Sequence, residues 1–299
     1  MPAAPPPYGS IAKPLHDLPI GIKRADEART VRPIVGNGSA SRRQPSMNAA
    51  SSLPSAPSVT AYAVDNLPMG DLAQMLKFYF HPTPNPMKVA LFLKEAGLDF
   101  ELAPVDTLKG EQHEAAFRKI NPNGKLPAIE DDGKRVFDSN AILLYLADKH
   151  GKFAGKAEDR GELLSWLMFI ATGVGPYSGQ SVHFRTVGKD KSDYAANRYL
   201  REAQRHYQVL DDHLAGREFF VGDDYTIVDM AAWGWIDRAK MVLGEGELAN
   251  YPNLSRWFAA IDARPAVAEA RKVGSDVGFK SERDEAALRA LFPQNYPAG

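Results

Sequence analysis

Apolar side chains follow two different spacings along the chain, and the change between them divides residues 75–299 into two parts. Up to about residue 150, short apolar runs typical of buried strands alternate with apolar positions three and four apart, which are typical of helices. The predicted order is βαβα followed by ββα. The predicted strands are Leu76–Phe80, Phe100–Val105, Leu126–Ile129 and Arg135–Phe137, helices follow Pro86, Glu114 and Asp138, and a hairpin turn lies at 131–133.

Prolines and glycines mark the predicted loops and the ends of the predicted helices. Three prolines within positions 82–86 predict a loop at 81–86, and Pro86 suits the first turn of a helix that ends at Gly97. After the linker His150–Lys156 only long helical patterns follow, and Gly173–Pro176 is expected to bend or break one of them. The helices predicted there are Glu158–Thr172, Asp193–Leu214, Thr226–Lys240, Leu254–Ala263 and Pro265–Arg271.

Composition adds a boundary near residue 75. The first 74 residues contain 11 of the 22 prolines and only two aromatic residues. Such a segment cannot bury enough apolar surface to offset the entropy of ordering it, so we expect a disordered tail. The predicted division is a tail at 1–74, an α/β domain at 75–150, an all-α domain at 157–275 and a C-terminal tail at 276–299.

Charge and cysteine content narrow the possible chemistry. The net charge of −1 gives no bulk attraction to nucleic acid or to an anionic membrane, and no apolar run approaches the ~18 residues that span a bilayer. The chain has no cysteine, so any thiol chemistry needs a thiol from outside. The seven histidines show no ligand-like spacing, and we therefore expect no metal site.

Two short motifs place backbone polar groups within reach of a ligand. Pro127 follows Leu126 at the start of a predicted strand, where it is either a plain edge proline or a cis residue that turns the backbone of Leu126 outward, toward a peptide-like ligand. Asp138 and Ser139 stand at a strand-to-helix junction, where Ser139 is expected to cap the helix. The helix N–H groups there suit a carboxylate, and Asp138 suits an ammonium group.

Further polar side chains lie beside the predicted helices. The Thr83 hydroxyl and the Asn85 amide both donate hydrogen bonds, which stabilise an anion at a helix N-terminus, although both residue types are also common in turns. Tyr177, Gln180 and His183 belong to a mixed aromatic and polar stretch. That stretch suits either the wall of a second-substrate pocket or ordinary core packing.

Four longer motifs occur in a fixed order across about Leu76–Lys272. They are Thr-Pro-Asn-Pro at 83–86, Asn-Pro-Asn-Gly-Lys-Leu-Pro-Ala-Ile at 121–129, Asp-Ser-Asn-Ala-Ile-Leu-Leu-Tyr-Leu at 138–146 and Thr-x-x-Asp at 226–229. Together they resemble the soluble glutathione transferase superfamily. Thr83–Asn85, Lys109–Gln112 and Gly175–Gln180 are most similar to the bacterial Nu class and the related fungal nitrogen-regulator-like transferases. The resemblance implies a thioredoxin-like N-terminal domain, an all-α C-terminal domain and a homodimer.

The resemblance also implies glutathione as the ligand, and a set of contacts. Thr83 and Asn85 would hold the glutathione sulfur, and Lys125 would approach the glycyl carboxylate. Asp138 stands where the family usually carries Glu. The residues implied in tripeptide binding are Gln112, Lys125, the backbone of Leu126, Pro127, Asp138 and Ser139, and those implied in a second-substrate wall are Tyr177, Gln180 and His183.

Tyr79 is a rival donor to the sulfur, because other classes of the superfamily use a Tyr near this strand. Its place in a strand of alternating faces favours core packing instead.

Two uncharged donors suffice in principle to ionise the thiol. A free thiol has a pKa of ~8.5, and lowering that pKa by ~2 units requires about 2.7 kcal/mol. Two hydrogen bonds to an anion, at ~1.5–3 kcal/mol each, supply this together with the helix dipole. The implied activity is glutathione-dependent disulfide exchange or conjugation to electrophiles, in the cytoplasm. The alternatives are an aryl-ether or thioether lyase that uses glutathione, and a non-catalytic glutathione-binding regulatory module.

Overall fold

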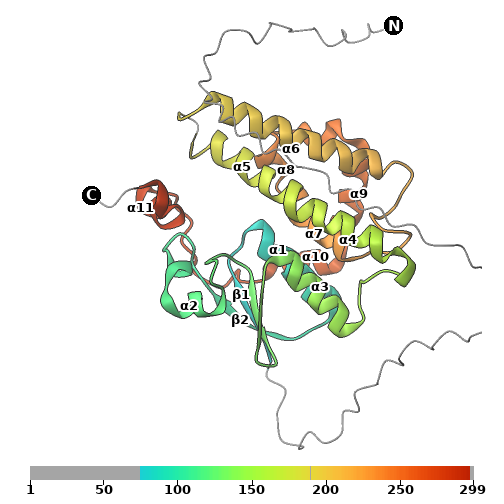
Figure 1. Ribbon diagram of the computed structural model, residues 1–299, viewed down its shortest axis with the longest axis horizontal. Helices are drawn as coiled ribbons and strands as arrows, with labels where there is room; N and C mark the ends of the chain where they lie inside the picture. The colour runs from blue at the N-terminus through green and yellow to red at the C-terminus, as the bar shows by residue number, and fades with distance from the viewer. Residues whose placement is uncertain (1–74, 189, 297–299) are drawn as a thin grey trace, which may run out of the picture. The chain divides into compact units, whose positions relative to one another are not determined.

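The computed structural model describes residues 75–188 and 190–296, so the tail expected at 1–74 lies outside the described residues. A four-stranded mixed sheet with its helices is followed by a helical region (Figure 1), as the sequence predicts. The elements are β1 Leu76–Phe80, α1 Pro84–Ala96, β2 Phe100–Pro104, α2 Ala115–Ile120, β3 Ala128–Asp131, β4 Lys134–Phe137, α3 Ser139–His150, α4 Arg160–Phe169, α5 Gly175–Arg185, α6 Asp193–His213, α7 Ile227–Ile236, α8 Ala239–Val242, α9 Pro252–Asp262, α10 Pro265–Lys272 and α11 Glu285–Leu291.

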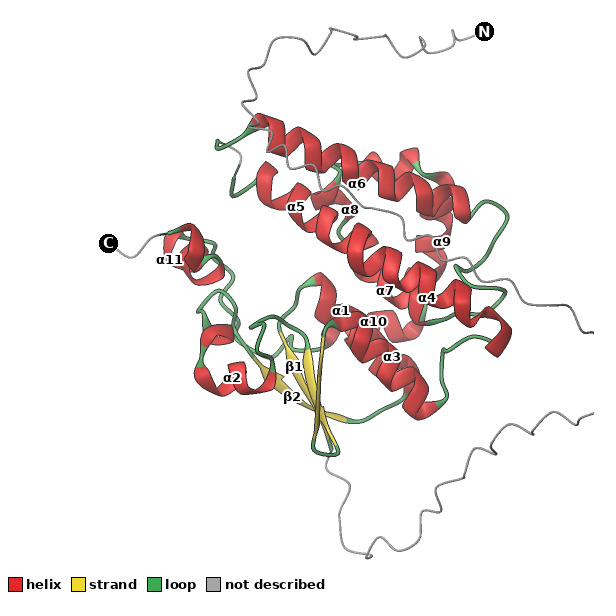
Figure 2. Cartoon of the chain, in the orientation of Figure 1, coloured by secondary structure: helices red, strands yellow, loops and turns green. Residues whose placement is uncertain are grey.

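The strands lie in the order β2-β1-β3-β4, with β1 parallel to β2 and β3 antiparallel to both of its neighbours. Helices cover both faces of the sheet (Figure 2). Phe78 and Phe80 point into the main core with α1 and α3, whereas Phe117 of α2 packs near Tyr79 on the opposite face. The alternation of side chains along β1 therefore fixes which helix covers which face.

Helix α1 is buried on almost every side, because it lies between the sheet and α7. Every residue from Pro86 to Leu93 is buried. A helix enclosed in this way needs apolar residues around its whole circumference, not only along one stripe. Lys88 is the charged exception within this run, and its environment is described below.

The first helix begins earlier than the sequence predicts. Residues 81–86 were expected to form a loop, but α1 starts at Pro84, with Thr83 as its N-cap residue. Prolines are tolerated in a first helical turn because the N–H that they lack would have no partner there. Asn85 consequently lies on the first turn of α1 and not in the preceding loop.

Helix α3 is capped by a different residue than expected. Asp138, at φ 72°, is the N-cap residue, and its side chain accepts hydrogen bonds from the backbone N–H groups of Asn140 and Ala141. Ser139 is instead the first residue of the helix and is buried. The Asp138 carboxylate therefore caps the free N–H groups of the first helical turn. The Ser139 hydroxyl is not used for capping and remains available for other contacts.

The glycine and proline cluster at 173–176 does not break the helix in which it lies. Residues Ile170–Val174 form a π-helical turn that leads directly into α5, with Pro176 in the first turn of α5. A π-turn widens the helix locally, so the helix continues although Pro176 has no N–H group to donate. The close approach of His206 to Gly173 adds a packing reason, because a Cβ there would lie 2.5 Å from the imidazole Nε2.

The C-terminal stretch 276–299, expected only as a tail, contains α11, and part of it packs on the α/β region. The backbone N–H of Lys280 donates to Asp106 Oδ2 at 2.7 Å, and the Phe279 ring lies 4.8 Å from the His81 ring, centroid to centroid. Burial acts to raise the pKa of Asp106, but hydrogen bonds from Lys280, Lys109 and Leu108 outweigh it and lower that pKa. Among the described helices, none has the length and apolar character needed to cross a membrane.

Candidate functional site

The segments that carry the predicted binding residues meet at one end of the two central strands, where β1 finishes and β3 starts. Residue Tyr79 of β1 pairs with Ala128 of β3 in antiparallel register. The chain leaving β1 toward Thr83 therefore runs beside the chain entering β3 through Pro127. The N-terminus of α1 begins at the same end, directly after the loop that contains Thr83.

Thr83 presents a hydroxyl that is weakly held by the protein. Its backbone is extended, its side chain makes no capping hydrogen bond, and its Oγ1 lies 3.5 Å from the carbonyl oxygen of His81. That distance is at the limit of a hydrogen bond. The hydroxyl is half-buried and free to turn toward an acceptor at the N-terminus of α1.

Asn85 is oriented by a tryptophan from the helical region. The indole Nε1 of Trp235, next to the C-terminal end of α7, donates to Asn85 Oδ1 at 3.1 Å. An indole N–H can only donate, so the contact identifies the oxygen of the Asn85 amide and leaves its NH₂ group as a donor on the other side. Helix α5 makes room for this ring, because a Cβ on Gly175 would lie 2.9 Å from Trp235 Nε1.

A cavity of about 230 Å³ is lined by Thr83 and by Trp235, the partner of Asn85, whereas Asn85 itself does not line it. Its walls combine the apolar side chains of Val182, Trp235 and Met241 with two guanidinium groups, those of Arg238 and Arg283. Thr83, with its neighbours Pro82 and Pro84, and Gly179 complete the lining. The cavity thus joins a hydrogen-bond donor at a helix N-terminus with both apolar and cationic surface.

A second cavity, of about 460 Å³, shares Gly179 with the first and lies toward the C-terminal segment. It is lined by Lys125, Gln180 and His183, and by residues that follow α11, namely Phe292, Gln294 and Asn295. Burial lowers the pKa of His183, whose ring lies 4.8 Å from that of Phe292, centroid to centroid. The structure thus places two of the expected wall residues, Gln180 and His183, at one cavity with Lys125.

The backbone before Pro127 is open to a ligand. The Leu126–Pro127 peptide bond is cis, which is one of the two alternatives that the sequence left open. Strand β3 begins only at Ala128, and within the described ranges the backbone N–H and C=O of Leu126 have no backbone partner. Such groups are able to pair with an extended peptide as an added strand would.

Gln112 is already in contact with the C-terminal segment. Its Nε2 donates to the carbonyl oxygen of Ala290 in α11 at 3.1 Å, and the neighbouring His113 ring contacts the same oxygen at 2.9 Å. Gln112 is buried, and its Oε1 has no hydrogen-bond partner among the described residues. A buried amide oxygen without a partner is unfavourable unless a ligand or water satisfies it.

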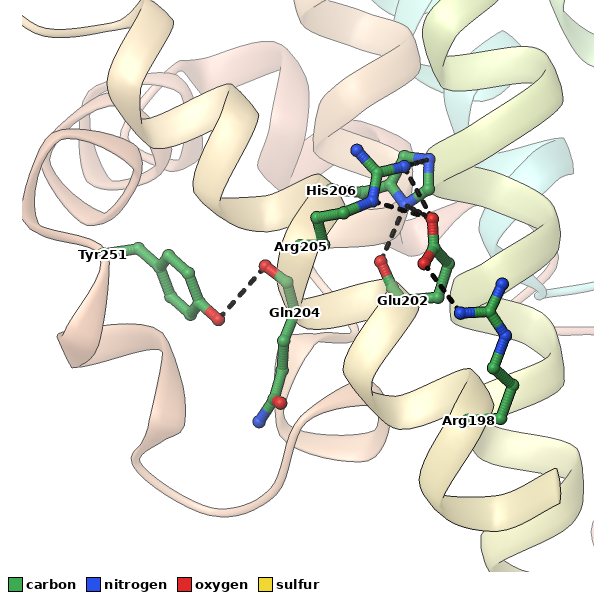
Figure 3. A network of polar contacts seen from close by, with 6 residues as sticks. All are labelled: Arg198, Glu202, Gln204, Arg205, His206 and Tyr251. Carbon is green, nitrogen blue, oxygen red and sulfur yellow. Dashed lines mark hydrogen bonds and ion pairs between the residues drawn. The ribbon is translucent and has the colours of Figure 1, made fainter. Parts of the chain in front are cut away.

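Tyr177 packs against α6 and lines neither of the two cavities. Its ring stacks on His206 of α6 at 5.1 Å between centroids. His206 is held in turn through contacts with Glu202 and Arg205, in the network drawn in Figure 3. The structure therefore gives Tyr177 the packing role that the sequence offered as the alternative.

Tyr79 is committed to a different partner. Its hydroxyl donates to Glu130 Oε2, its ring packs against Phe117, and burial together with the Glu130 contact raises its pKa. A phenol engaged in this way on the α2 face is poorly placed to donate to a ligand at α1.

Several lining residues escape sequence analysis. Trp235 and Arg238 fall within the predicted helix Thr226–Lys240, Met241 directly follows it, and Arg283 and Phe292 fall in the predicted tail. Only the three-dimensional packing brings these distant positions together. In the described ranges, no group of three or more His, Cys, Asp or Glu side chains is placed to hold a metal ion.

Comparison with known proteins gives the same family for both halves of the chain. Residues 74–148 match the N-terminal domain model of glutathione S-transferases, and residues 166–265 match the C-terminal domain model. A curated relative from Escherichia coli, the disulfide-bond oxidoreductase YfcG, is 41% identical over 207 residues, which cover 66% of this chain and 94% of that protein. Another E. coli protein, the disulfide-bond oxidoreductase YghU, is 35% identical over 236 residues, covering 73% of this chain and 80% of that protein.

Solved structures of glutathione transferases are also similar to this chain. A glutathione transferase family member from Pseudomonas fluorescens, crystallised with two glutathione molecules, has a TM-score of 0.63 at 37% identity and covers 68% of this chain and 95% of its own. A glutathione transferase from Pseudomonas putida, with one glutathione disulfide bound per subunit, has a TM-score of 0.62 at 33% identity. The match covers 67% of this chain and 91% of that chain. The family predicted from the motifs is confirmed: the chain belongs to the glutathione S-transferase family.

Proposed function

We propose that the protein binds glutathione, stabilises its thiolate with Thr83 and Asn85, and uses that thiolate to reduce disulfides. The observation that carries the proposal is the Trp235–Asn85 hydrogen bond, since it occupies the amide oxygen and leaves the NH₂ group of Asn85 as a donor in the first turn of α1, two residues after Thr83. Both relatives from E. coli are disulfide-bond oxidoreductases, and the chain has no cysteine of its own. The nucleophile must therefore come from the bound tripeptide.

The reaction proceeds by two exchanges. A bound thiolate attacks one sulfur of the substrate disulfide, the substrate S–S bond breaks, and the leaving thiolate takes a proton from solvent. A second glutathione thiolate attacks the mixed disulfide and releases the other substrate thiol with oxidised glutathione. Two glutathione molecules are thus oxidised for each disulfide reduced. With an electrophilic carbon in place of the disulfide, the same thiolate forms a thioether and displaces the leaving group.

We assign the rest of the tripeptide to the neighbouring segments. The open backbone of Leu126 before Pro127 suits the cysteinyl portion, and the exposed Lys125 suits the glycyl carboxylate. The N-terminus of α3, with Asp138 and Ser139, suits the γ-glutamyl end, which carries both a carboxylate and an ammonium group.

Gln112 and the first cavity complete the assignment. The unpartnered Oε1 of Gln112 is an acceptor for a ligand N–H group. Arg238 and Arg283 suit carboxylates on a second peptide thiol or disulfide, because guanidinium groups bind carboxylates well. We propose Gln180 and His183 as the second-substrate wall on the side of the larger cavity.

Two further features of the proposal concern assembly and location. A homodimer is proposed from family membership, and exposed apolar side chains at Phe137, Leu164 and Met168 offer surface for it. A cytoplasmic location is proposed because glutathione is abundant there. Light scattering of the purified protein tests the first point, and fractionation of the source cells tests the second.

The test of the function is the double variant Thr83→Ala/Asn85→Ala. We expect disulfide-reducing turnover with glutathione to fall at least about tenfold, because each lost hydrogen bond to an anion is worth ~1.5–3 kcal/mol. The circular dichroism spectrum should not change, since neither side chain belongs to the core. Unchanged kinetics would contradict the assigned roles, and binding of glutathione by the wild type without any turnover would favour the non-catalytic module.

A further inference from the structure

A lysine lies fully inside the protein next to the proposed γ-glutamyl site. Lys88 in α1 is 1% exposed, whereas lysines are almost never fully buried unless they are paired. Its stem passes α7 where Gly234 leaves room, since a Cβ on Gly234 would lie 2.6 Å from Lys88 Cγ. Gly234 therefore makes room both for the stem of Lys88 and for the backbone of α1, since a Cβ there would also lie 2.7 Å from the carbonyl oxygen of Pro84.

The ammonium has one hydrogen-bond partner among the described residues. Lys88 Nζ lies 3.4 Å from Ser139 Oγ, at the N-terminus of α3, and the contact is buried. No carboxylate in the described ranges lies within ion-pair distance of Nζ, and Asp138 acts on it only at longer range. Burial lowers the pKa of Lys88 to about 7, which reflects a cation that is incompletely compensated.

The direction of this hydrogen bond determines what Ser139 can do. An ammonium only donates, so the Ser139 oxygen accepts from Lys88, and the hydroxyl proton remains available for another acceptor. Among the described hydrogen bonds, Ser139 donates none. The N–H groups of Asn140 and Ala141 are occupied by Asp138, so the groups that converge here are the Ser139 hydroxyl, the Ser139 backbone N–H and the Lys88 ammonium. Together they have the polarity that an anion requires.

We propose that Lys88 is a positioning residue for the γ-glutamyl carboxylate of glutathione, acting through the Ser139 hydroxyl. This inference rests on the proposed function. The bound carboxylate accepts the Ser139 proton and provides the negative partner that the buried ammonium lacks in the protein alone. Lys88 does not touch the reacting sulfur, so its effect belongs to ligand binding and not to the exchange chemistry.

The test compares Lys88→Met with Lys94→Met in titration calorimetry. Met preserves the length of the side chain without its charge, and Lys94 is an exposed lysine on the same helix whose Nζ lies over the ring of Phe100 in β2. The two ligands are glutathione and cysteinylglycine, which lacks the γ-glutamyl residue. In the titrations, we expect Lys88→Met to weaken glutathione binding tenfold or more and to leave cysteinylglycine binding within twofold. In initial-rate measurements of disulfide reduction, the same variant should raise KM for glutathione more than it lowers kcat. Lys94→Met should leave all values unchanged.

A coupling measurement keeps the inference testable if Lys88→Met fails to fold in a thermal melt. The variant Ser139→Ala keeps the ammonium, and it should weaken the binding of glutathione but not of cysteinylglycine. Where both single variants fold, the double variant should bind glutathione no more weakly than Ser139→Ala alone, because Lys88 acts through the Ser139 hydroxyl. For the wild type, the ¹⁵N resonance of Lys88 Nζ should shift on adding glutathione and not on adding cysteinylglycine. Equal weakening of both ligands by Lys88→Met, or an Nζ resonance unmoved by glutathione, would overturn the inference. A wild type that binds no glutathione would overturn the proposed function as well.

Discussion

The hydrogen bond from Trp235 to Asn85 is the most direct point at which to test how the helical region prepares the sulfur site. Replacing Trp235 by Phe keeps an aromatic ring against Gly175 and removes the N–H that holds Asn85 Oδ1 at 3.1 Å. The Asn85 amide then rotates freely, and its NH₂ group no longer points to one place. The thiolate loses part of its stabilisation although no residue that touches it has changed.

The magnitude follows from the type of bond. A neutral hydrogen bond contributes about 0.5–1.5 kcal/mol net. Removing it should therefore raise the pKa of the bound thiol by ~0.4–1.1 units and lower kcat/KM by ~2–13-fold. Asn85→Ala removes the donor itself, a bond to an anion worth ~1.5–3 kcal/mol, and should lower kcat/KM by ~12–160-fold. The tryptophan variant should thus be the milder of the two.

The assay measures two quantities for each variant. Thiolate absorbance in the ultraviolet against pH gives the pKa of bound glutathione, and initial rates of disulfide reduction give kcat/KM. Trp166→Phe is the matched control, since Trp166 lies in α4, is half-buried and packs on His213. Because Trp235 acts through Asn85, the double variant with Asn85→Ala should be no worse than Asn85→Ala alone. Wild-type values for Trp235→Phe, or fully additive effects in the double variant, would refute the reasoning.

Three further predictions concern stability. Gly234→Ala should destabilise the fold by ~1–3 kcal/mol in thermal denaturation, because the added Cβ would lie 2.6 Å from Lys88 Cγ. The control Gly161→Ala, whose added Cβ would have nothing within 4 Å, should be neutral or stabilising. Equal effects of the two substitutions would contradict the packing argument. Asp229→Ala should destabilise by ~1–3 kcal/mol for each buried donor that it leaves without a partner, measured in denaturant unfolding, since the buried carboxylate accepts from Thr226 N, Phe220 N and Trp257 Nε1. A total loss below ~1 kcal/mol would show that these donors find other partners. The pKa of Asp106 is lowered on folding, so its stabilisation is present above the unfolded value of ~3.9 and lost as pH falls through the folded value. Asp106→Asn should therefore flatten the acid limb of the stability curve, and an unchanged acid limb would contradict the role given to the contact with the segment before α11.

The sequence was sufficient for the four strands, most of the helices and the family, and it suggested the residues that the proposal assigns to glutathione. A short apolar run predicts β1, and the Thr-x-x-Asp spacing at 226–229 is that of a capping box, which the structure contains at the start of α7. These features are local: each depends on residues a few positions apart and on backbone preferences that hold in any fold. For the same reason the four motifs, taken together and in order, indicate the family before any packing is known.

The tertiary structure decided the matters that depend on distant residues. Pro84 lies inside a helix because the first turn tolerates it, Tyr177 packs on α6, and α11 reaches Gln112 from the far end of the chain. The orientation of the Asn85 amide depends on Trp235, 150 positions away. A sequence pattern records the spacing of neighbours, whereas these contacts depend on which helix faces lie against each other, and that is fixed only when the whole core packs.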